Sequence, residues 1–119
     1  MSLRHTVRIR WHLDDAIAFG PGKAELLAAI RDCGSISSAA RKLDMSYRRA
    51  WLLVETMNRC FDPPLVASAT GGSGGGGAKL TEAGLAVLAA FDQLQANVAA
   101  VIEAGQPSFE QHVRKTLAD

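Results

Sequence analysis

The stretch that decides the fold is GSISSAARKLDMSYRRAW, which runs from Gly34 to Trp51. Ser35 and Ser46 stand where helices begin, because a serine hydroxyl accepts a hydrogen bond from the free amides of a first helical turn. The spacing therefore predicts one short helix over Ile36–Leu43 and a second over Tyr47–Arg59.

The residues between and inside these two helices fit a close crossing. Ala39 and Ala40 are small at the point where the helices approach each other. Asp44 occupies the turn, where Asp tolerates a left-handed backbone better than most residues. The remaining apolar positions of the motif are filled by Leu43, Met45, Ala50 and Leu53. The stretch predicts a helix-turn-helix.

The flanking sequence supplies the rest of a small domain. Polar and apolar residues alternate over Thr6–Leu13, which predicts a half-buried strand, and helical spacing predicts a first helix over Lys23–Cys33. Two short strand candidates, Leu65–Thr70 and Ala78–Leu80, enclose the glycine-rich segment Gly71–Gly77. We expect them to form a hairpin, the wing of a winged helix-turn-helix.

A long helix is predicted from Thr81 to about Ala104. Its apolar residues are spaced four, three, four and three apart, which is typical of a helix pairing with another helix; they are Val87, Phe91, Leu94, Val98 and Val101. A short helix is expected in the tail after Pro107. The predicted fold is mainly α with a small β-sheet: a winged helix-turn-helix over residues 1–80, then a dimerisation helix and a short C-terminal helix over residues 81–119.

Composition and charge place the chain among globular proteins. The apolar share is 48% and the net charge is +1. The charge is uneven: residues 1–60 carry ten Lys/Arg and six Asp/Glu, and residues 61–119 carry three and six. Such asymmetry is a modest indication of nucleic-acid contact. Cys33 and Cys60 show no zinc-binding spacing. The sequence predicts a cytoplasmic protein with no membrane segment of the roughly 20 apolar residues that a spanning helix needs.

The second helix of the motif carries the candidate base-reading residues Tyr47, Arg48, Arg49 and Trp51. The first turn of a recognition helix enters the major groove, and the planar fork of arginine donates twice to guanine. Trp51 is expected either to contact DNA or to lie partly in the core. Phosphate contacts are expected from Ser35, Ser46, Arg41, Lys42, Gly72, Ser73, Gly74, Gly75 and Lys79, since amides and cations bind the DNA backbone.

No enzyme is expected from this sequence. Gly72–Gly77 satisfies the GxGxxG pattern only because it is a run of glycines, and no Gly-Lys-Ser/Thr follows it. The three histidines are scattered, and no catalytic or metal-binding set stands out. The alternative to DNA binding is a winged-helix module that pairs with another protein through the long helix.

Several segments together resemble the N-terminal DNA-binding domain of ModE-type molybdate-responsive regulators, which is related to the LysR-type winged helix. The resemblance covers about Gly22 to Leu94 and is carried by the segments Gly34–Ser37, Met45–Trp51, Met57–Asn58 and Thr70–Ala78.

The resemblance implies a homodimer, joined through the long helix, on a palindromic operator of double-stranded DNA. Members of that family bind the oxyanion in C-terminal β-rich domains. Little more than a short helix follows Pro107 in this sequence, so no cofactor is expected here, and a separate protein would supply oxyanion sensing. Ser73 stands where the family often places a basic residue, and Lys79 compensates only in part.

Overall fold

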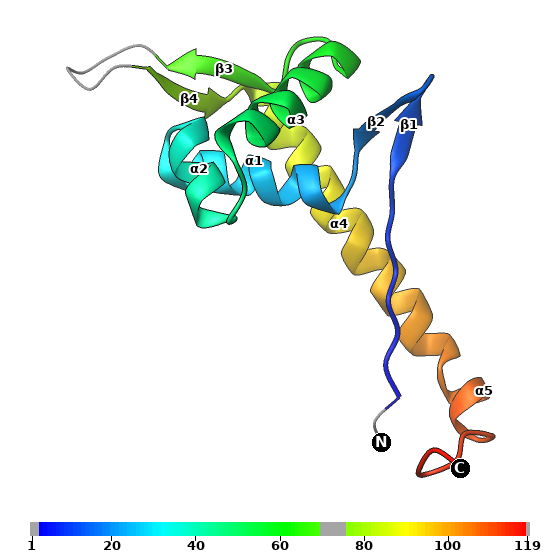
Figure 1. Cartoon of the computed structure of the whole chain (residues 1–119). Coiled ribbons are helices and arrows are strands. Elements are labelled where there is room, and N and C mark those ends of the chain that lie inside the picture. The colour runs from blue at the N-terminus through cyan, green and yellow to red at the C-terminus, as the bar shows by residue number, and fades with distance from the viewer. Residues whose placement is uncertain (1–2, 70–75, 119) are drawn as a thin grey trace.

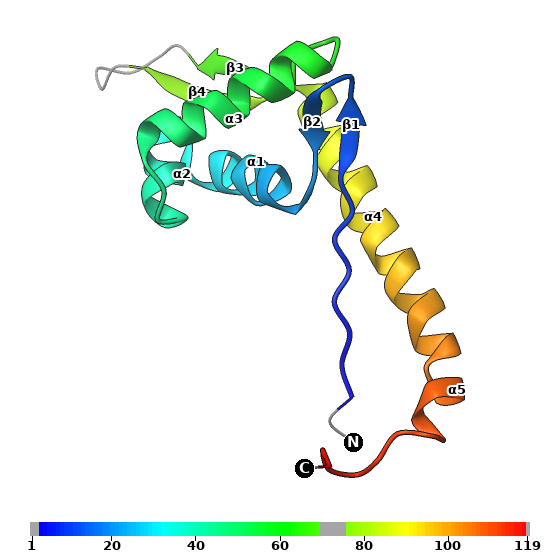
Figure 2. The same cartoon turned by 45° about the vertical axis from the view of Figure 1, so that its right-hand side comes forward.

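A computed structural model of the chain describes residues 3–69 and 76–118. The elements are β1 (Trp11–Leu13), β2 (Ala16–Phe19), α1 (Pro21–Cys33), α2 (Ile36–Lys42), α3 (Tyr47–Cys60), β3 (Val66–Ala69), β4 (Gly77–Leu80), α4 (Glu82–Gly105) and α5 (Pro107–Glu110). Helices α1, α2 and α3 form a body with the β3–β4 hairpin beside it, and α4 projects away from that body (Figures 1 and 2). The predicted winged helix-turn-helix with a long helix is confirmed.

Side-chain caps and one left-handed residue fix the helix-turn-helix. The Ser35 hydroxyl accepts from the amide of Ser38, and the Ser46 hydroxyl accepts from the amide of Arg49, both at 3.1 Å. Asp44 adopts a φ of 55°, so the left-handed turn expected from the sequence is present. Each cap satisfies an amide that the first helical turn leaves free.

The core lies where α1, α2 and α3 meet the first turns of α4. Ala39 and Ala50 are fully buried, as expected for helices that cross closely. Phe19, from β2, lies edge-to-face against Phe91 of α4 and Phe61 after α3, with ring centroids 5.1 and 6.1 Å away. Such aromatic pairs stabilise a core beyond the area that they bury.

The wing is tied to the recognition helix by one side chain. Strands β3 and β4 pair antiparallel, from Val66 opposite Leu80 to Ala69 opposite Gly77. The Asn58 side-chain oxygen accepts from the amides of Leu65 and Val66 at 2.9 and 3.1 Å, and its amide donates to the Val66 carbonyl at 3.0 Å. Asn58 therefore sets the direction in which the wing leaves α3.

The N-terminal strand is shorter than predicted. Only Trp11–Leu13 pairs, antiparallel with β2, and the expectation of a strand from Thr6 to Arg10 is wrong. These earlier residues run extended beside the outer part of α4 (Figures 1 and 2), and no strand among the described residues lies next to them. The apolar side of the segment is only partly covered: Val7, Trp11 and Leu13 are 46%, 51% and 48% exposed, whereas Ile9 is half-buried and packs against the core.

Helix α4 divides into a buried part and a projecting part. Its first three turns join the domain core through Gly84, Leu88 and Phe91, so the predicted boundary between residues 80 and 81 falls inside one packed unit. The remainder extends the molecule to 60 × 28 × 25 Å.

By length and composition, Glu82–Glu110 is apolar enough to cross a membrane, and only 11% of its most apolar stretch is buried. The sequence-based expectation that no segment reaches this length is therefore corrected. One such helix is weak evidence of a membrane segment.

The tail forms less helix than expected. Helix α5 is a single turn, Pro107–Glu110, and Phe109 and Leu117 are 72% and 98% exposed. Isolated helices as short as this one are only marginally stable. A single turn also does not form the longer apolar face that the spacing of Phe109, Val113 and Leu117 suggested.

Candidate nucleic-acid interface

Helix α3 presents the predicted base-reading residues on its open face. Ala50, Val54 and Met57 face the core, which turns the opposite side of the helix outward. Tyr47 and Trp51 are 55% and 44% exposed. Trp51, for which core and surface positions were both open, therefore lies largely at the surface.

The two arginines of this face are also exposed, and no carboxylate neutralises them. Among residues 3–69 and 76–118, the ion pairs are Arg31 with Asp32 and Lys42 with Asp32. Arg48 and Arg49 lie in the first turn of α3 and belong to neither pair. The guanidinium groups keep their donors free for an external acceptor.

The α2 residues expected to bind phosphate are exposed or half-buried, with weak local partners. Arg41 donates to the Ser38 hydroxyl at 3.2 Å, and the Lys42 ammonium lies 3.9 Å from the Asp32 carboxylate. Exposed contacts of this kind contribute little and exchange readily for a phosphate. The hydroxyls of Ser35 and Ser46 accept cap hydrogen bonds, and the Ser35 hydroxyl also shares a 3.4 Å hydrogen bond with the Ser37 hydroxyl.

The wing residues are only partly placed. Gly72, Ser73, Gly74 and Gly75 lie outside the described residues. Lys79 is exposed on β4, opposite Ala67. The predicted wing contacts therefore stay a prediction, with Lys79 on the strand that leads into the tip.

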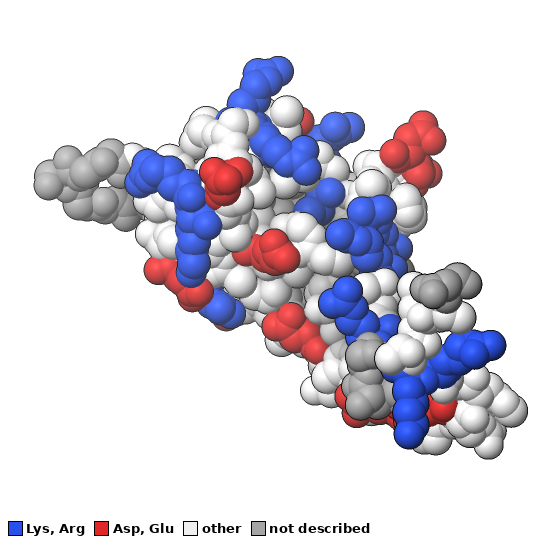
Figure 3. All heavy atoms as spheres, turned by 60° about the horizontal axis from the view of Figure 1, so that its bottom comes forward, with Lys and Arg blue, Asp and Glu red and all other residues white. Residues whose placement is uncertain are grey.

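Charged side chains of both signs lie on the surface of the molecule. Figure 3 shows Lys and Arg side chains at several places on one face of the molecule, with acidic side chains between them. Both signs of charge therefore share this face, in keeping with a net charge of +1.

One basic residue of the helical body, Lys23, was not singled out from the sequence. Lys23 is the third residue of α1 and is only 8% exposed. Burial lowers the pKa of its ammonium, and the charges of Arg49 and Arg10 lower it further, whereas Cys60 acts in the opposite direction. The available sequence signal was a lysine directly after Pro21-Gly22, in a first helical turn with no acidic residue.

The predicted dimerisation residues separate into two groups. Phe91 is 3% exposed and packs on Phe19, so its side chain belongs to this chain's own core. Val101 is 73% exposed, while Val87, Leu94 and Val98 are half-buried. Any pairing surface on α4 therefore excludes the Phe91 side chain.

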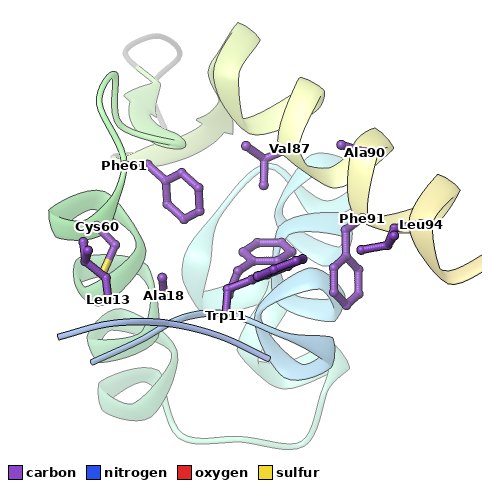
Figure 4. Close-up of a pocket in the computed structure, with 10 residues that line it drawn as sticks. Trp11, Leu13, Ala18, Cys60, Phe61, Val87, Ala90, Phe91 and Leu94 are labelled. Atoms are coloured by element: carbon purple, nitrogen blue, oxygen red, sulfur yellow. The ribbon is translucent and has the colours of Figure 1, made fainter. Parts of the chain in front are cut away.

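An apolar hollow of about 390 Å³ lies between the β1–β2 hairpin, the end of α3 and α4. Trp11, Phe61, Val87 and Leu94 surround it in Figure 4, with Cys60 at the α3 side. The hollow continues the exposed apolar surface of β1 onto α4.

Comparison with known proteins places this architecture in a family. Residues 22–85 match the bacterial regulatory helix-turn-helix proteins of the lysR family. The match begins at the first turn of α1 and ends in the first turn of α4, so it includes the helix-turn-helix and the wing.

Individual relatives are longer than this chain. The molybdenum-pterin-binding protein MopB of Rhodobacter capsulatus is 44% identical over 89 residues, which are 75% of this chain and 33% of MopB. The transcriptional regulator ModE of Haemophilus influenzae is 39% identical over 70% of this chain and 32% of its own length. The DNA-binding transcriptional dual regulator ModE of Escherichia coli K12 is 42% identical over 62% and 28%. The chain thus spans about a third of the length of these relatives.

Proposed function

Since this chain belongs to the lysR family of bacterial regulatory helix-turn-helix proteins, we propose that it binds double-stranded DNA and regulates transcription. The observation that carries the proposal is the pair Arg48 and Arg49, exposed in the first turn of α3 with no acidic partner in the described chain. In a helix-turn-helix this turn enters the major groove.

Each part of the interface has a distinct task in this proposal. Arg48 and Arg49 donate to guanine edges, and Tyr47 donates to a phosphate or packs on a sugar. Arg41, Lys42 and Lys79 bind phosphates on either side of the groove, which adds affinity without sequence preference. No catalytic step is part of this function.

The protein acts as a homodimer in this proposal. Exposed apolar side chains on β1 and the outer α4, with the hollow between them, form a surface that water solvates poorly. A second copy of the chain covers such a surface through a two-fold axis, and a two-fold protein binds a palindromic operator. If α4 is buried against the same helix of a second copy, its apolar character is explained without a membrane. The proposed location of the protein is therefore the cytoplasm.

A link to molybdenum follows from the relatives. Three regulators or transport proteins named ModE and two molybdenum-pterin-binding proteins match the helix-turn-helix region of this chain. We propose that the regulated genes serve molybdenum metabolism and that this chain binds no cofactor itself. Any oxyanion sensing then comes from a separate protein.

The test of DNA binding starts from a duplex selected by the protein from a random pool. Replacing Arg48 with Ala is expected to weaken binding by more than about 1 kcal/mol and to relax the preference at one base pair, because a bidentate contact to guanine is lost. Arg114→Ala, in the exposed tail, is the matched control and leaves the affinity unchanged.

Fluorescence anisotropy across a salt series supplies the measurement. The proposal fails if the wild-type protein selects no duplex and shows no affinity at low salt. A stable complex with another protein under the same conditions then favours the interaction module.

A further inference from the structure

Leu52 is an exposed apolar residue of α3 to which the proposed function gives no task. It lies in the second turn of the helix and is 42% exposed, whereas Leu53 beside it packs against the core. Within the described residues, Leu52 is not among the side chains that form or border that core. A lone exposed leucine is ordinary on a protein surface, so its place on the helix and its neighbours decide whether it has a function.

Leu52 lies on the side of α3 that points directly away from the core. The buried residues of the helix are Ala50, Val54 and Met57. At about 3.6 residues per turn, Leu52 stands roughly 170° around the axis from the middle of this buried stripe. Arg48, four residues earlier, is on the same outer side, because residues spaced in this way are neighbours on one face of a helix. Leu52 and Arg48 therefore meet the same partner.

The surroundings of Leu52 combine apolar side chains with positive charge. Tyr47 and Trp51 are exposed in the same two turns of the helix, and so are Arg48 and Arg49. Neither arginine belongs to an ion pair among the described residues. Water solvates the apolar part of this face poorly, and a wholly apolar partner would bury the two guanidinium groups without acceptors. A fitting partner therefore offers hydrogen-bond acceptors and an apolar group side by side.

We propose that Leu52 contacts the C5-methyl group of a thymine in the major groove and so makes α3 select thymine at that position. The major groove presents two acceptors on the edge of guanine and, on thymine, an apolar methyl group. Arg48 donates to the guanine while Leu52 packs on the methyl group. This inference rests on the proposed DNA binding, and it names a second kind of base that the same helix reads.

The spacing of the two side chains fits neighbouring base pairs. Four residues advance about 6 Å along a helix, and base pairs lie about 3.4 Å apart along DNA, so the thymine is expected within about two base pairs of the guanine that Arg48 contacts. A duplex is favoured over a second protein because Leu52 lies one turn beyond Arg48, in a helix whose first turn enters the major groove in helix-turn-helix proteins.

The test removes single methyl groups from the DNA. Each thymine of the duplex that the protein selects is replaced in turn by deoxyuridine, which lacks only the C5-methyl group. One position for each bound protomer is expected to weaken binding about fourfold, as for one buried methyl group, and the other positions are expected to have little effect. Fluorescence anisotropy at one salt concentration is the measurement, because the substitution leaves the charge of the duplex unchanged.

Leu52→Ala connects this effect to the protein. It is expected to bind the thymine duplex at least about fourfold more weakly for each bound protomer, and to show no further loss on the deoxyuridine duplex, because both changes remove the same contact. Leu52→Met keeps an apolar side chain of similar size and is expected to retain the preference for thymine. Leu117→Ala, in the exposed tail, is the matched control and is expected to change neither the affinity nor the preference.

Folding is checked by the Tm of each variant. Leu52 is exposed and stands apart from the core, and Ala and Met are good helix formers, so both Leu52 variants are expected to keep the wild-type Tm. Arg48→Ala locates the site on the duplex. The base pair at which it relaxes the preference is expected within about two base pairs of the thymine that is sensitive to deoxyuridine.

The outcomes separate this inference from the proposed function. A wild-type protein that selects no duplex and has no affinity at low salt overturns both. A selected duplex that tolerates deoxyuridine at every position, or a deoxyuridine effect that Leu52→Ala leaves unchanged, overturns only the thymine contact. If Trp51→Ala abolishes the effect instead, the contact belongs to Trp51 and the inference is wrong. It is also wrong if Leu52→Ala alters the oligomeric state in sedimentation but not the deoxyuridine profile, because the leucine then joins two copies of the protein.

Discussion

At the scale of single residues, Gly84 allows the long helix to pack closely against the wing because it has no side chain. A Cβ at this position would lie far inside van der Waals contact with the Leu65 carbonyl oxygen. That oxygen also accepts from the amide of Thr81 at 2.9 Å, while the Thr81 hydroxyl donates to Pro64 at 2.6 Å and accepts from Gly84. The start of α4 is therefore held directly against the segment that leads into β3.

Gly84→Ala is expected to lower the free energy of unfolding by at least about 2 kcal/mol, because backbone must shift to admit the methyl group. Helix propensity alone predicts that the same change raises the free energy of unfolding by about 1 kcal/mol. Gly105→Ala separates the two effects, since nothing lies within 4 Å of its added Cβ. Urea denaturation of both variants is the measurement, and a stabilised Gly84→Ala protein would contradict the close contact.

At the scale of elements, the wing depends on α3 for its orientation. Asn58 makes three hydrogen bonds to Leu65 and Val66, and all three cross from the helix to the strand. The amide side chain is suited to this task because it both accepts and donates. The sequence indicated Asn58 only through the family resemblance, and its partners became evident from the structure.

Asn58→Ala is expected to cost about 2 kcal/mol of unfolding free energy, because the two amides lose their acceptor in a partly buried position. Asn97→Ala is the control: its hydrogen bond with Gln93 lies on the exposed side of α4, and its loss is expected to cost less than about 0.5 kcal/mol. Amide hydrogen exchange gives a local readout, with faster exchange at Leu65 and Val66. Unchanged exchange at both amides would refute the anchoring role.

At the scale of the whole molecule, the projecting part of α4 is the surface through which two copies are proposed to pair. Val101→Glu is expected to give a folded monomer, since Val101 is 73% exposed and a charge there opposes only the proposed pairing of two copies. Phe91→Glu is expected to unfold the protein, because Phe91 is 3% exposed and packs on Phe19.

Sedimentation equilibrium and circular dichroism distinguish the two variants. A wild-type protein that is monomeric at micromolar concentration would contradict the homodimer. So would a Val101→Glu dimer as stable as the wild type. Loss of the dimer is expected to lower the DNA affinity, because each protomer then binds its half-site without the help of the other.

The sequence by itself determined the elements whose signals are local. Ser35, Ser46 and Asp44 fix the ends and the turn of the helix-turn-helix through hydrogen bonds and backbone angles within a few residues, and the exposed arginines follow from that register. Only the tertiary structure decided which apolar residues of α4 are core and that Lys23 of α1 is buried. Those properties depend on which distant segments approach, and periodicity gives the face of a helix without naming its neighbour. The N-terminal segment shows the same limit, since alternation allowed a strand from Thr6, but no strand in the described part of the chain pairs with its first residues.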